Sequence, residues 1–120
     1  MDTTVSGSVD SWAVTPQKVD AAVRRAIEVA RAQRIYLFGS YVNPKADGSP
    51  PNDLDILVVA DDSIASVHDE SVRIRSALKN ITMAMDIVVV RKSRFEHFAE
   101  VPGYVFREAL THGRLVHHAG

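Results

Sequence analysis

The chain has 120 residues and a formal net charge of −1 at pH 7, with 46% hydrophobic and 24% charged residues. This length and composition are typical of a globular domain with its own core, and the near-neutral charge does not indicate direct nucleic-acid binding. The absence of cysteine excludes a disulfide scaffold and a zinc–thiolate site. No signal peptide is recognisable, and no apolar run approaches the roughly 20 residues that cross a bilayer, so we expect a cytoplasmic protein.

Residues 1–14 are small and polar and are predicted to form a flexible arm before a single domain over residues 15–118. Thr15 as N-cap and Pro16 at the first helical position predict the start of a helix. Residues 34–39 have the length and the β-forming residues of a buried strand.

After a turn-rich loop, residues 53–60 predict a second strand. Asp61, Asp62 or Ser63 is expected to cap a helix that runs to about Asn80. Residues 83–90 predict a third strand, which is apolar except for Asp86.

In the C-terminal part, Ser93 and Glu96 form a capping-box pattern that predicts a short helix. A last helix over residues 104–112 is expected to end at Gly113, and residues 114–118 predict a short edge strand. The link between the first two strands is too short for a helical crossover, which favours antiparallel pairing. The fold class is therefore α/β, a small mixed sheet of three to four strands with helices packed against it.

Carboxylates interrupt two of the predicted strands. Side chains alternate along a strand, so Asp53 and Asp55 share one face, about 7 Å apart. Asp86 interrupts an apolar strand, and it converges with the first two if the strands are neighbours. Unpaired buried carboxylates are unfavourable, and a bound divalent cation such as Mg²⁺ resolves this. The alternative is that Asp53 belongs to a turn and Asp55 lies at a solvated strand end.

Gly39 and Ser40 lie at the end of the first predicted strand and supply hydrogen-bond donors, in contrast to the negative charge of the carboxylates. A strand that ends in Gly-Ser and turns into a short helix presents N–H groups and a hydroxyl that suit a phosphate. The alternative is an ordinary turn at a strand end.

The chain resembles the minimal nucleotidyltransferase domains of the polymerase-beta-like superfamily. The resemblance is carried by "LFGS", a loop, "DLDILVV" and a later strand with one more aspartate. The C-terminal "YVFREALTHGRLVHH" is also similar to the end of these small proteins, and the resemblance spans about residues 33–117. It implies the nucleotidyltransferase fold.

The resemblance also implies roles for individual residues. Gly39 and Ser40 would hold the triphosphate of ATP or another nucleoside triphosphate, while Asp53 and Asp55 would bind Mg²⁺. Asp86 would help to hold a second metal ion and would act on the acceptor hydroxyl as a base or by orienting it. The reaction would be in-line attack on the α-phosphorus, with pyrophosphate leaving.

Two departures from the family pattern concern the loop. Residues 41–52 make twelve residues between Gly-Ser and the first aspartate, where about ten are common. The family often has Ala-Arg-Gly soon after Gly-Ser, where this chain has Val-Asn-Pro at residues 42–44. Lys45 is the candidate substitute for the missing cation, and Tyr41 is either a wall of the nucleotide pocket or a structural residue.

Many small members of this superfamily are encoded beside a helical HEPN-type toxin, act as its antitoxin, and in several cases transfer AMP to a tyrosine of the toxin. The resemblance therefore implies a protein partner of this kind. One alternative is a non-catalytic subunit that neutralises the partner by contact. Another is transfer to a small molecule such as an aminoglycoside, for which we expect a further acceptor-binding domain.

Overall fold

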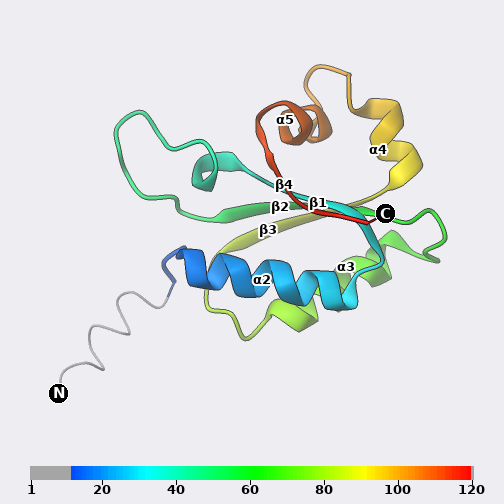
Figure 1. The fold of residues 1–120 in the computed structure, drawn as a ribbon, viewed down its shortest axis with the longest axis horizontal. Coiled ribbons are helices and arrows are strands. Elements are labelled where there is room, and N and C mark those ends of the chain that lie inside the picture. The colour runs from blue at the N-terminus through cyan, green and yellow to red at the C-terminus, as the bar shows by residue number, and fades with distance from the viewer. Residues whose placement is uncertain (1–11, 120) are drawn as a thin grey trace.

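The computed structural model describes residues 12–119, which form a mixed four-stranded sheet with helices on both faces (Figure 1). The strand order is β3-β2-β1-β4, and β1 runs antiparallel to β2 and β4 while β2 and β3 are parallel. In chain order the elements are α2 (Pro16–Val29), β1 (Ala32–Phe38), η1 (Gly39–Tyr41), β2 (Leu54–Ala60), α3 (Val67–Leu78), β3 (Met85–Arg91), α4 (Lys92–Phe98), α5 (Val105–His112) and β4 (Arg114–His118). This arrangement confirms the predicted fold class.

The sheet separates two hydrophobic clusters. Helices α2 and α3 cover one face, where they pack on β1 and β2 side chains such as Ile35 and Ile56. Helices α4 and α5 cover the other face, where Phe95 and Phe106 pack near Leu57 of β2. Both phenylalanines are buried, and no described helix is long and apolar enough to cross a membrane.

The start of α2 agrees with its sequence signal. The Thr15 hydroxyl accepts a hydrogen bond from the Lys18 backbone N–H at 3.2 Å, and Pro16 is the first helical residue. The predicted arm falls largely on residues 1–11, which lie outside the described residues, so the domain boundaries stay predictions.

Two predicted helix starts are wrong. The α3 N-cap is Ser66, whose hydroxyl accepts from the Asp69 N–H, whereas Asp61 caps a turn by accepting from the Ser63 N–H at 2.8 Å. The N-cap of α4 is Arg91, and Ser93 lies within the helix, where its N–H donates to the Asp62 carboxylate. Asp and Ser are common both at helix N-caps and in turns, and here Asp61 and Ser93 form turn or bridging contacts instead of caps.

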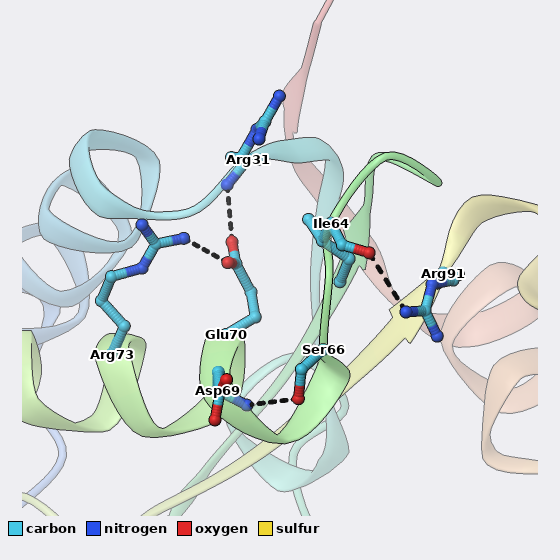
Figure 2. Close-up of polar contacts among 7 residues, drawn as sticks. All are labelled: Arg31, Ile64, Ser66, Asp69, Glu70, Arg73 and Arg91. Atoms are coloured by element: carbon cyan, nitrogen blue, oxygen red, sulfur yellow. Dashed lines mark hydrogen bonds and ion pairs between the residues drawn. The ribbon is translucent and has the colours of Figure 1, made fainter.

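Glu70 joins α3 to the segment between α2 and β1 (Figure 2). It is the buried charged side chain of the described core, with 4% of its surface exposed. Its carboxylate accepts from the Arg31 backbone N–H at 2.7 Å and pairs with the Arg73 guanidinium. These contacts lie at the end of the sheet where β1 begins.

Candidate active site

The opposite end of the sheet, where β1 ends and β2 begins, gathers the predicted site residues. Asp55 of β2 is paired in register with Asp86 of β3 on one side and with Phe38 of β1 on the other. Since paired residues share a face, Asp55 and Asp86 lie on the same side of the sheet, next to the Gly39–Ser40 turn. Strands β2 and β3 are therefore neighbours, as the predicted convergence of the three aspartates requires.

Asp53 lies directly before β2 rather than within it. The strand was expected to begin at Asp53, but it begins at Leu54, because β3 pairs from Leu54 onward and β1 reaches only to Asp55. Asp53 is thus outside the ladder, although its charge still acts on Asp55. Asp55 is half-buried and is the second residue of the strand.

The Asp55 carboxyl lies in an electrostatically unfavourable position. Burial raises its pKa above the ordinary value of 3.8, and the nearby charges of Asp53 and Asp86 raise it further. Among residues 12–119, none of the three carboxylates has a hydrogen-bond or ion-pair partner. This end of the sheet therefore carries negative charge that described side chains do not neutralise.

Gly39 makes close contact with this carboxylate possible. A Cβ at position 39 would lie 1.9 Å from Asp55 Oδ2, and the backbone φ of +79° is also one that L-residues rarely adopt. The chain then turns as η1, with the Val42 and Asn43 N–H groups donating to the Gly39 carbonyl. The short helix expected after Gly-Ser is therefore present, as a 3₁₀ turn held against Asp55.

Ser40 lies in the middle of this turn and is half-buried. Within the described part of the chain its hydroxyl makes no hydrogen bond. Backbone N–H groups at the start of a helical turn also lack partners in the turn itself. The turn can thus donate hydrogen bonds to an anion in front of it.

The two other predicted binding residues are placed differently. Tyr41 is half-buried and packs against the core under α2, with the Arg114 guanidinium 6.0 Å from its ring centroid. Lys45 is exposed in the loop, where its carbonyl accepts from the Gly48 N–H. Within the described residues, no ion pair joins Lys45 to Asp53, Asp55 or Asp86.

Arg114 is a cation near the turn that was not predicted from the sequence; it pairs with Leu37 and therefore lies on the other face of the sheet from Asp55 and Asp86. Its signal was indirect, because the predicted edge strand at residues 114–118 had to pair with β1 to bring Arg114 to this end. No local spacing encodes a contact between residues so far apart in the chain.

The three aspartates supply oxygen ligands that suit a divalent metal, but they do not form a complete coordination shell by themselves. Carboxylate oxygens are the hard ligands that Mg²⁺ prefers. Within residues 12–119, however, no three carboxylate or imidazole groups lie close enough to hold one ion by themselves. Mg²⁺ commonly takes one or two carboxylates together with substrate phosphate oxygens, and this arrangement suits that mode.

A match to a protein-family model assigns the chain to a family. The family model described as polymerase beta, nucleotidyltransferase matches residues 24–119. The chain belongs to the polymerase beta nucleotidyltransferase family. Comparisons with curated proteins and with solved structures found no significant match.

Membership of this nucleotidyltransferase family confirms the superfamily inferred from "LFGS" and "DLDILVV". It supports nucleotidyl transfer as the general reaction class. Members of the family typically depend on a nucleoside triphosphate and a divalent metal. The matched residues include the Gly39–Ser40 turn and all three aspartates.

Proposed function

We propose that this nucleotidyltransferase is Mg²⁺-dependent and transfers AMP from ATP to a hydroxyl, namely a tyrosine of a helical HEPN-type toxin that it neutralises as an antitoxin. The observation that carries the proposal is the set of three unpartnered carboxylates at the sheet end beside the Gly39–Ser40 turn. Such a set is unfavourable in the protein alone and suits a bound metal–triphosphate. The toxin partner and the tyrosine rest on the resemblance.

In this mechanism Gly39 and Ser40 hold the triphosphate with N–H groups and the Ser40 hydroxyl. Asp53 and Asp55 would hold Mg²⁺, which when bound supplies neutralising charge to the phosphate oxygens. The acceptor oxygen bonds to the α-phosphorus as the bond to the bridging oxygen breaks, and pyrophosphate leaves. Asp86, which is exposed beside Asp55, accepts the hydroxyl proton.

A non-catalytic subunit that acts by contact is the second candidate. It is favoured by Val-Asn-Pro at residues 42–44, in place of the arginine-containing segment after Gly-Ser. In that case the carboxylates contribute to neither partner binding nor neutralisation.

The test uses ATP labelled on the α- or the γ-phosphate, Mg²⁺ and, as acceptor, the helical HEPN-type toxin proposed as the partner. We expect α-label but not γ-label on a partner tyrosine, and at least about a hundredfold less in Asp53→Asn/Asp55→Asn, because metal binding would be lost. Partner binding by the variant, measured in the same samples, is the control. Full toxin neutralisation by the variant without label transfer would overturn the catalytic proposal in favour of the contact mechanism.

A further inference from the structure

Helix α5 lies on the same face of the sheet as the carboxylates and ends near them. Phe38 of β1 is paired in register with Asp55 and packs in the cluster that contains Phe106 of α5. Because paired residues share a face, α5 covers the face that carries Asp55. Strand β4 begins directly after the residue that follows α5, and its first residue pairs with Leu37, next to the end of β1. The last turn of α5 therefore lies near the Gly39–Ser40 turn.

Asn43 joins this turn to α5 directly. Its side-chain amide donates to the His112 carbonyl at 2.8 Å, and its backbone N–H donates to the Gly39 carbonyl at 2.9 Å. The His112 carbonyl belongs to the C-terminus of α5, where carbonyl groups lack partners within the helix. Pro44 disfavours helical backbone at Asn43, so the turn does not continue beyond it. One residue thus closes the turn and ties it to α5.

The other hydrogen bonds of residues 39–52 do not reach another element in the described part of the chain. They close within the segment, as at Ser49, whose hydroxyl donates to the Asp47 carboxylate at 2.7 Å. Gly39 follows β1 directly, so the strand fixes the start of the turn. Asn43 therefore makes the hydrogen bond that anchors its far end.

We propose that Asn43 is a positioning residue, which holds the Gly39–Ser40 turn in place for a triphosphate by tying it to the end of α5. A turn that is fixed before the ligand arrives loses less freedom on binding, and this increases affinity. The inference rests on the proposed function, because it assumes that the turn binds a nucleoside triphosphate. It gives Val-Asn-Pro at residues 42–44 a role in nucleotide binding, although this segment contributes no cation.

The test is calorimetric titration of ATP and of AMP, each with Mg²⁺, into the wild type, Asn43→Ala and Asn43→Gln. We expect Asn43→Ala to weaken ATP binding about three- to tenfold, the size of one net hydrogen bond, and AMP binding by less than about twofold, because AMP lacks the outer phosphates. Asn43→Gln should recover part of the loss, since it keeps an amide donor at an exposed position. Melting curves show that each variant is folded at the temperature of the titration.

Ser49→Ala is the matched control, because it removes an uncharged side-chain hydrogen bond from the same loop, one that does not reach α5. It should bind ATP like the wild type. Wild-type-like ATP binding by Asn43→Ala, an equal loss for ATP and AMP, or the same loss in Asn43→Gln or Ser49→Ala would overturn the role of Asn43 and leave the proposed function standing. No ATP binding by the folded wild type would instead overturn the proposed function, and the role of Asn43 with it.

Discussion

At the scale of single residues, Gly39 and Asp55 depend on each other. The carboxylate occupies the space in which any other residue at position 39 would place its Cβ. The sequence suggested both residues, since a Gly-Ser after a strand and a carboxylate within one are visible in the chain. Their close contact could not be predicted, because it depends on the β1–β2 register, which places Phe38 opposite Asp55.

We expect Gly39→Ala to destabilise the protein more than alanine at other glycines of positive φ. Gly48 and Gly103 have φ values of +76° and +93° and open space where a Cβ would be, so alanine there should lower the free energy of unfolding by about 1–2 kcal/mol. At Gly39 the forced movement of Asp55 adds about 1–3 kcal/mol. Urea unfolding of the three variants measures the difference, and equal losses would show that Asp55 moves aside freely.

At the scale of elements, the strands and the start of α2 were predictable, but the starts of α3 and α4 were not. Each predicted strand lies within two residues of the observed one, because long apolar runs have few alternatives to a buried strand. Asp61 and Ser93 carry typical cap signals, yet Asp61 closes a turn and Ser93 donates through its N–H to Asp62. Local sequence does not distinguish these uses of the same side chains, since the long-range partner decides.

Glu70 should contribute to stability by joining α3 to the segment before β1. We expect Glu70→Gln to lower the free energy of unfolding by about 1–3 kcal/mol, because a buried amide loses the ionic contact with Arg73. Asp69→Asn is the matched control, because it removes the same charge at the preceding position of the first helical turn, which is exposed. It should change stability by less than about 1 kcal/mol, and similar losses in both variants would contradict a specific role for Glu70.

At the scale of the whole molecule, strand order places the candidate site. The antiparallel β1–β2 pair was predictable from the short link, but the adjacency of β2 and β3 was only a condition of the carboxylate hypothesis. The position of β4 beside β1 was not predictable, because edge-strand pairing depends on how α4 and α5 return the chain across the sheet. As a result, the sequence indicated the carboxylates and the Gly-Ser turn but not which strand lies on the other side of β1.

The central claim is that this sheet end binds a nucleoside triphosphate together with a metal ion. The most direct measurement is calorimetric titration of ATP into the wild type and into Asp53→Asn/Asp55→Asn, each with Mg²⁺ and with a chelator. We predict wild-type binding that needs Mg²⁺ and is weakened at least about tenfold in the double variant, because the two carboxylates would hold the ion. The claim is contradicted if the folded wild type binds no ATP, or if the double variant binds it as tightly as the wild type.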